Sequence, residues 1–223
     1  MTKVVTVKRR ALAANEERAE RLRARFAASG TLVANLISSP GSGKTSLLEA
    51  TVRALDDELT TAVIEGDVAT ENDADRIRAL GVPAHQILTG GACHLDARLV
   101  ETGIEEGGLP EVDILFIENV GNLICPTTYD LGEDFKVVLL SVAEGDDKPV
   151  KYPAIFARAE VAVVTKSDLL PHVPFDLDSV KSQIASLNPN GTVLVTSSLQ
   201  GDGMDEWFDL LRARLLAKRQ SLG

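Results

Sequence analysis

The residues with the clearest chemical potential form a glycine-rich segment that follows an apolar stretch. Residues 32–37 predict a buried strand, and residues 38–45 then read Ser-Ser-Pro-Gly-Ser-Gly-Lys-Thr. The glycines let backbone N–H groups turn inward around phosphate oxygens, while Lys44 adds a positive charge and Thr45 a hydroxyl ligand for Mg²⁺. The pattern predicts a phosphate-binding loop that opens a helix, with contacts from Gly41, Ser42, Gly43, Lys44, Thr45 and Ser46.

This loop departs from the pattern G-x-x-x-x-G-K-[ST] at one position. Ser38 stands where the first glycine is usual. We expect a tighter start of the loop with the phosphate cradle preserved. The alternative is an ordinary glycine-rich turn between a strand and a helix.

Two further strands are expected to end in carboxylates. Residues 60–64 lead into Glu65-Gly66-Asp67, and the apolar residues 112–117 lead into Glu118. Ligands bind at the carboxyl edge of an open α/β sheet, so Asp67 and Glu118 are candidates for Mg²⁺ coordination. Asp67 alternatively caps the segment 69–80. The candidate catalytic residues are Lys44, Thr45, Asp67 and Glu118.

A third group of residues bears on the base of the nucleotide. Guanine presents two adjacent donors, and the single carboxylate of Asp168 can accept both, while Lys166 can lie across the base. The usual GTPase pattern is Asn-Lys-x-Asp, and Thr165 stands at the Asn position, which leaves its contact to the phosphate loop open. Ser197 lies in a Thr-Ser-Ser segment that resembles the loop supporting the base from the other side. These residues favour a guanine-binding segment over a simple surface turn at the end of a strand.

A metal-binding hypothesis rests on Cys93, His94 and Cys125, the one group of soft and borderline ligands. Two glycines before Cys93 are expected to place it with His94 at a helix N-terminus, where the dipole favours a thiolate. Three ligands are too few for a closed zinc site, so water, a partner or a second copy would complete it. These ligands suit Ni(II), Zn(II) or Cu alike, and inert core cysteines are the alternative.

Length and composition fit one domain. The phosphate loop between a strand and a helix predicts an α/β fold of the P-loop NTPase type, with a mostly parallel central sheet and helices on both faces. Residues 1–30 are expected to form a basic amphipathic helix of the same domain as the GTPase region 31–223, with Asn15 as N-cap of a helix through 28. This basic start fits a solvated helix better than a docking arm.

The formal net charge of −10 argues against nucleic-acid and anionic-membrane partners. Two cysteines cannot form a disulfide framework, and no long apolar segment is present at the N-terminus. We therefore expect a cytoplasmic protein with no membrane association.

The chain resembles the HypB family of nickel-incorporation GTPases, which belongs to the SIMIBI class of P-loop GTPases. The Cys-His pair and the Asn-Leu-Ile-Cys-Pro segment separate this family from the urease accessory GTPase UreG. The matching segments are 38–45, 65–67, 91–97, 118–126 and 146–153.

The resemblance implies Mg²⁺-dependent GTP hydrolysis coupled to nickel delivery into the large subunit of [NiFe]-hydrogenase, with a HypA-family partner. It also implies a GTP-dependent homodimer that shares a metal site of Cys93, His94 and Cys125, for Ni²⁺ or Zn²⁺. Lys148 matches a lysine that reaches the nucleotide across the dimer, and Thr45, Asp67 and Glu118 match the Mg²⁺ ligands. No Cys-rich or His-rich tract precedes Cys93, so we expect nickel to bind only at the site of Cys93, His94 and Cys125.

The leading hypothesis is a slow GTPase switch, because no water-orienting Gln is evident and residues 118–121 adjoin Cys125. A P-loop small-molecule kinase is the second possibility, but it would prefer ATP and leave Asp168 without a role. A non-enzymatic metal-binding dimer is the third, and it would bind metal equally well with GTP and GDP.

Overall fold

A seven-stranded parallel sheet organises the chain, which the computed structural model describes over residues 2–67 and 72–222. The strand order is β3-β2-β4-β1-β5-β6-β7, and every neighbouring pair is parallel. The strands are β1 (Leu32–Ser38), β2 (Thr61–Asp67), β3 (Ala84–Leu88), β4 (Ile114–Glu118), β5 (Phe135–Ser141), β6 (Val161–Thr165) and β7 (Thr192–Val195). The strands predicted at 32–37, 60–64 and 112–117 are confirmed, with ends shifted by at most three residues.

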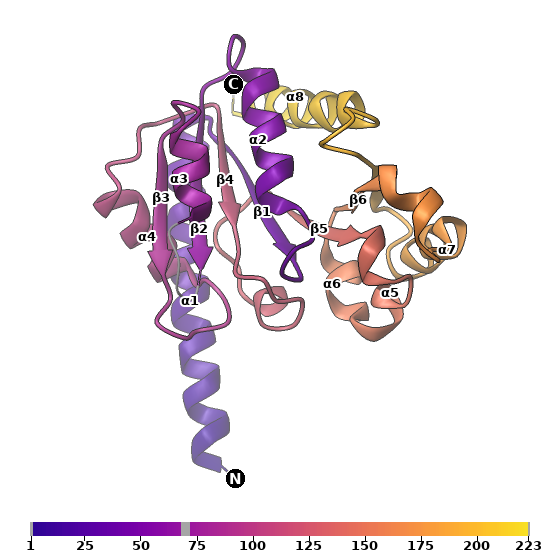
Figure 1. Ribbon diagram of the computed structural model, residues 1–223. Helices are drawn as coiled ribbons and strands as arrows, with labels where there is room; N and C mark the ends of the chain where they lie inside the picture. Colours follow the sequence, from indigo (N-terminus) through magenta and orange to yellow (C-terminus); the bar gives the residue numbers. More distant parts are fainter. Residues whose placement is uncertain (1, 68–71, 223) are drawn as a thin grey trace.

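Helices cover both faces because the central strands are apolar on both sides. In β1, Leu32 and Ala34 join one core with α2 (Lys44–Leu55), α3 (Asn72–Arg78) and α8 (Met204–Ser221). Val33 faces the other side, where α1 (Thr2–Ser29) and α4 (Ala97–Glu106) cover one half of the sheet. The other half of that side is covered by α6 (Pro153–Arg158) and α7 (Leu177–Leu187). Figure 1 shows this layered arrangement, which confirms the predicted α/β fold class.

All seven strands end at the same edge of the sheet, since they are parallel. Ser38, Asp67, Glu118 and Thr165 are the last residues of β1, β2, β4 and β6. The central position of β1 places the phosphate loop between the ends of its neighbours β4 and β5. This edge therefore gathers the segments that carry the candidate site residues.

The amino-terminal helix differs from the prediction at Asn15. Helix α1 runs from Thr2 to Ser29, so Asn15 lies inside it and is not an N-cap. Its side chain is buried and bonds to the backbone of Ala97 and Asp130, which lie far along the sequence. The predicted apolar face is buried through Ala19, Leu22 and Phe26. Through these residues α1 packs against the core on this face of the sheet.

The segment 145–153 contains the short helix α5 (Lys148–Lys151) and the start of α6. Asp147 accepts the backbone hydrogen bond from Lys151, and Pro149 at the first turn suits a helix start. The expected capping of 69–80 by Asp67 falls partly on residues 68–71, which lie outside the described residues.

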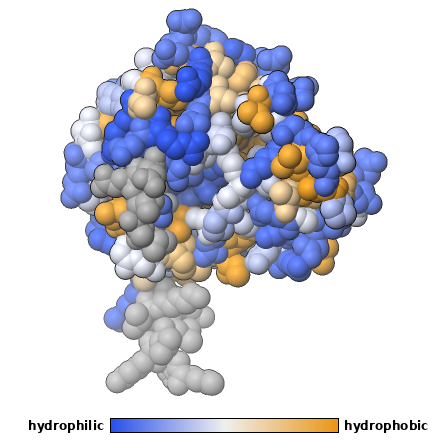
Figure 2. Space-filling model, in the orientation of Figure 1, coloured by the Kyte–Doolittle hydropathy of each residue, from blue (hydrophilic) through white to orange (hydrophobic). Residues whose placement is uncertain are grey.

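The surface in Figure 2 is mainly hydrophilic, with hydrophobic side chains in small separate groups. Exposed apolar residues near the site edge include Leu88 and Ile124, with 54% and 65% of their surface accessible. Within the described ranges, no helix combines the length and the apolar character needed to cross a bilayer.

Candidate nucleotide and metal site

The phosphate loop has the backbone conformation that its glycines predict. Gly41 and Gly43 have φ angles of +77° and +89°, in the left-handed region that side chains disfavour. Gly43 is also the N-cap of α2, so the loop passes directly into the helix N-terminus. Backbone N–H groups and the helix dipole therefore face the same space.

The side chain of Lys44 is held at the start of the loop. Its Nζ donates a 2.9 Å hydrogen bond to Ser38 Oγ and lies 3.8 Å from Glu118 Oε1. Thr45 Oγ1 donates to the same carboxylate oxygen at 3.2 Å. Ser38, the departure from the usual motif, thus supplies a hydroxyl acceptor that receives the lysine.

Two buried carboxylates meet beneath this lysine. Burial and the neighbouring Glu118 carboxylate raise the pKa of Glu65 to about 11, so Glu65 is protonated at neutral pH. Burial also raises the pKa of Glu118, although Lys44 opposes the shift. Glu65 Oε1 and Glu118 Oε2 are buried without a hydrogen-bond partner. Carboxyl oxygens without hydrogen-bond partners, beside the Thr45 hydroxyl, fit the oxygen ligands that Mg²⁺ prefers.

A hollow of about 420 Å³ opens in front of these groups. It is lined by the phosphate loop, by the ends of β2 and β4, and by Lys166. Gly121 closes one side, because an added Cβ there would lie 2.8 Å from Pro40 Cγ. The lining residues include Gly41, Gly43, Lys44, Thr45, Ser46, Asp67, Asp73, Arg76 and Glu118.

The residues expected to bind the base also come together. Thr165 Oγ1 donates a 2.6 Å hydrogen bond to the backbone oxygen of Ser42, so a threonine can support the phosphate loop. Lys166 adopts a φ of +58° and its Nζ donates to the Gly41 oxygen at 2.7 Å. Asp168 accepts a 2.6 Å hydrogen bond from Ser197 Oγ, which fixes its carboxylate. We call Thr165, Lys166, Asp168 and Ser197 the base platform, because the sequence predicts that they hold the base.

Lys148 also contacts the phosphate loop of its own chain. Its Nζ lies 3.3 Å from Ser39 Oγ and 3.4 Å from Glu144 Oε2. Glu144 in turn accepts a short hydrogen bond from Ser42 Oγ. A carboxylate that contacts both Lys148 and the loop was not anticipated from the sequence.

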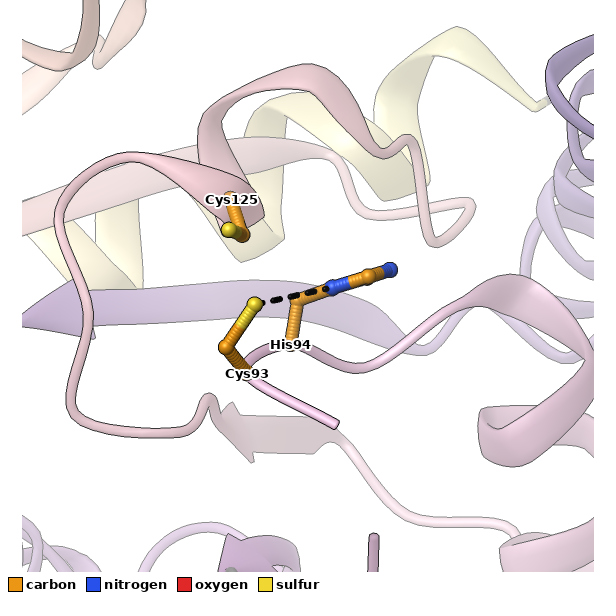
Figure 3. A group of neighbouring side chains, drawn as sticks. All are labelled: Cys93, His94 and Cys125. Atoms are coloured by element: carbon orange, nitrogen blue, oxygen red, sulfur yellow. Dashed lines mark hydrogen bonds between the residues drawn. The ribbon is translucent and has the colours of Figure 1, made fainter. Parts of the chain in front are cut away.

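The three candidate metal ligands lie on two facing segments. Figure 3 shows Cys93 and His94 on one segment and Cys125 on the other, at the start of the 3-10 turn η1 (Cys125–Thr128). One ligand atom from each residue lies within 4.8 Å of the others. Cys93 Sγ is 3.7 Å from His94 Nδ1, and the imidazole stacks on Tyr129 with a centroid distance of 3.9 Å.

The electrostatics of this cluster differ from expectation. Helix α4 begins at Ala97 with Asp96 as its N-cap, so Cys93 and His94 precede the helix and are not at its N-terminus. A hydrogen bond with the Cys125 thiol raises the pKa of Cys93, so the predicted dipole-stabilised thiolate is wrong. Burial lowers the pKa of His94, which leaves its imidazole neutral and able to bind a metal.

Two asparagines connect the metal segments to the nucleotide site. Asn119, directly after Glu118, accepts a 3.1 Å hydrogen bond from the backbone N–H of Leu95. Asn122 donates a 3.2 Å hydrogen bond to the backbone oxygen of Cys93. Both asparagines belong to the segment that leads from β4 to Cys125.

The sequence indicated no role for Glu65, Glu144 and Asn119. For Glu65 a signal existed, since it interrupts an otherwise apolar strand. Glu144 and Asn119 contact Ser42 and Leu95, which lie 102 and 24 residues away, and sequence spacing alone gave no indication of these contacts.

The fold and the loop geometry define a P-loop nucleotide-binding protein of the α/β class. Residues 32–195 match the family model described as the CobW/HypB/UreG nucleotide-binding domain. The hydrogenase maturation factor HypB of Escherichia coli K12 is 50% identical over 203 residues, covering 91% of this chain and 70% of that protein. The chain belongs to the CobW/HypB/UreG family and, within it, to the HypB hydrogenase maturation factors.

Solved structures agree with this assignment. HypB from Archaeoglobus fulgidus is 39% identical, with a TM-score of 0.86 over 92% of this chain and 100% of that one. HypB from Helicobacter pylori, solved in complex with nickel, is 40% identical, with a TM-score of 0.86 over 94% of this chain and 97% of that one.

Proposed function

We propose that this chain is a Mg²⁺-dependent GTPase that binds nickel and couples its nucleotide state to nickel delivery into [NiFe]-hydrogenase. The observation that carries the proposal is the position of the Cys93, His94 and Cys125 cluster, which is hydrogen-bonded to the segment that follows Glu118. Membership of the HypB family, with one relative solved in complex with nickel, supports nickel as the cargo.

Nucleotide binding uses the loop and the base platform together. The loop N–H groups and Lys44 hold the β- and γ-phosphates, and Asp168, fixed by Ser197, accepts the two donors of guanine. Thr45, Asp67 and Glu118 would hold Mg²⁺, which neutralises charge on the phosphate oxygens when bound. No nucleophilic side chain is required, because hydrolysis of this kind depends on positioning and electrostatics.

The segment between β4 and η1 would couple the nucleotide site to the metal ligands. Gly121 packs against Pro40, so a γ-phosphate at the loop would act on this segment. The same segment holds Leu95 through Asn119, holds Cys93 through Asn122, and leads directly into Cys125. A change at the phosphate would thereby alter the spacing of the metal ligands.

A homodimer completes the proposal. Three ligands leave a coordination position open, and the exposed Ile124 beside Cys125 offers apolar surface to a second copy. We propose that GTP favours this dimer, in which Lys148 reaches the partner's nucleotide, and that a HypA-family protein and the hydrogenase large subunit are the nickel partners. Zn²⁺ would compete for the same ligands.

Two measurements on the purified protein test this function. The rates of phosphate release from GTP and from ATP distinguish a GTPase from a small-molecule kinase, which would prefer ATP. We expect a clear preference for GTP. Cys125→Ala should abolish or strongly weaken Ni(II) binding while GDP affinity stays within about twofold of the unaltered protein. Equal loss of both would instead identify Cys125 as a core residue, and preference for ATP would refute the GTPase.

A further inference from the structure

The amino-terminal helix α1 contacts both segments that carry the metal ligands. Asn15 Oδ1 accepts a 2.8 Å hydrogen bond from the backbone N–H of Ala97, three residues after His94. Asn15 Nδ2 donates a 2.8 Å hydrogen bond to the backbone oxygen of Asp130, five residues after Cys125. Only 7% of Asn15 is exposed. One buried amide therefore ties together two segments that meet only in the folded chain.

A second residue of α1 holds the same region. Arg23 Nη2 lies 2.7 and 2.6 Å from the two carboxylate oxygens of Asp130. The backbone at Gly132 adjoins the helix so closely that an added Cβ would lie 2.8 Å from the Ala19 oxygen. The Arg23 and Asp130 side chains are each about two-fifths exposed, so this ion pair fixes position more than it adds stability.

Apolar packing makes the arrangement rigid. Ala19 and Leu22 of α1 share one buried cluster with Leu95 and Ala97, on either side of the α4 N-cap, and with Leu131. Displacement of either metal segment would open this close-packed cluster.

The contacts of α1 also influence the orientation of His94, one of the candidate metal ligands. Tyr129 directly precedes Asp130, and its ring stacks on the His94 imidazole at an interplanar angle of 25°. The direction in which an imidazole nitrogen points determines its fit to a metal, and partners outside the ligand set fix that direction. Asn15 and Arg23 hold the residue next to Tyr129, and so act on His94 through it.

We propose that α1 is the platform of the metal site and that Asn15 is a positioning residue for His94 and Cys125. The inference rests on the proposed function, since it takes these residues as nickel ligands. It gives the basic helix a function that neither a docking arm nor a solvated surface helix would have.

The test compares Asn15→Ala with Asn188→Ala, a control whose amide donates a 2.9 Å hydrogen bond to the Ala159 oxygen, outside the segments that carry the metal ligands. Ni(II) affinity is measured by competition with a chromogenic chelator, together with GDP affinity and the nickel–thiolate absorption spectrum. We expect Asn15→Ala to weaken Ni(II) binding by roughly tenfold or more and to change the spectrum, with GDP affinity unchanged. Equal behaviour of the two variants would overturn the inference.

A milder pair covers the case in which Asn15→Ala does not fold. Arg23→Gln removes the contact to Asp130, whereas Arg21→Gln removes only a pair with Glu17 on the same helix. We expect Ni(II) binding to weaken roughly threefold in the first and not in the second. Failure of the unaltered protein to bind Ni(II) would refute the proposed function and this inference with it. Normal Ni(II) binding by both Asn15→Ala and Arg23→Gln would refute this inference alone.

Discussion

The backbone N–H of Leu95 donates a hydrogen bond to the side chain of Asn119, so the residue after His94 is tied to the residue after Glu118. Asn119 is buried and also bonds to Asn35 in β1, the strand that leads into the phosphate loop. The metal segment and the nucleotide segment therefore share one buried polar contact. Such contacts are costly to leave half satisfied, which makes them suited to transmit a displacement.

The first prediction concerns this contact. Asn119→Ala leaves the Leu95 N–H without its acceptor, and it should lower the free energy of unfolding by about 1–3 kcal/mol. We expect the ratio of Ni(II) affinities measured with GDP and with a GTP analogue to approach one. Asn188→Ala serves as the control and should retain the ratio of the unaltered protein. An Asn119→Ala ratio equal to that of the unaltered protein would exclude a relay through Asn119.

The second prediction concerns the base. Asp168→Asn removes the carboxylate that accepts two guanine donors, and hydrogen bonds to charged groups contribute about 1.5–3 kcal/mol each. GTP binding should therefore weaken by at least about tenfold, while xanthosine triphosphate, which offers an acceptor where guanine has an amino group, should bind better than before. Competition with a fluorescent nucleotide measures both changes. Unchanged GTP binding would contradict the base platform.

The third prediction concerns Thr165, which replaces the usual Asn. Thr165→Val keeps the shape of the side chain but loses the 2.6 Å hydrogen bond to Ser42. A buried hydrogen bond of this kind contributes about 1 kcal/mol, so GDP affinity should fall about fivefold. If titration calorimetry finds no loss, the hydroxyl does not support the loop.

The fourth prediction follows from the raised pKa of Glu65. A carboxyl group whose pKa is about 11 when folded takes up a proton on folding at neutral pH, so its stabilising effect, full below pH 4.5, declines as the pH rises. Glu65→Gln resembles the protonated form at every pH, so folding of this variant requires no proton uptake at this position. We expect it to stabilise the nucleotide-free protein, by an amount that grows from pH 5 to pH 8. Thermal unfolding at several pH values measures this, and a gain independent of pH would argue against a protonated Glu65.

Strand positions could be predicted from the sequence because buried parallel strands are continuous apolar runs, as in residues 32–37 and 112–117. The phosphate loop could be predicted because its backbone requirement is local, at Gly41 and Gly43. The contacts of Asn15 could not, since its partners Ala97 and Asp130 are distant in sequence, and Asn is a common N-cap residue.

The protonation state of Cys93 shows the same limit. Sequence placed it after two glycines and before a helix, which favours a thiolate, but its pKa depends on Cys125, 32 positions away in sequence.

Coupling between nucleotide and metal can be measured in a single set of samples. Ni(II) is titrated calorimetrically into the purified protein with Mg²⁺ and GDP, and again with a non-hydrolysable GTP analogue, while light scattering reports the oligomeric state. We predict that the GTP analogue changes the Ni(II) affinity and raises the dimer population together. Identical Ni(II) affinity in the two nucleotide states would contradict the switch and would leave a metal-binding protein in which the nucleotide is only structural.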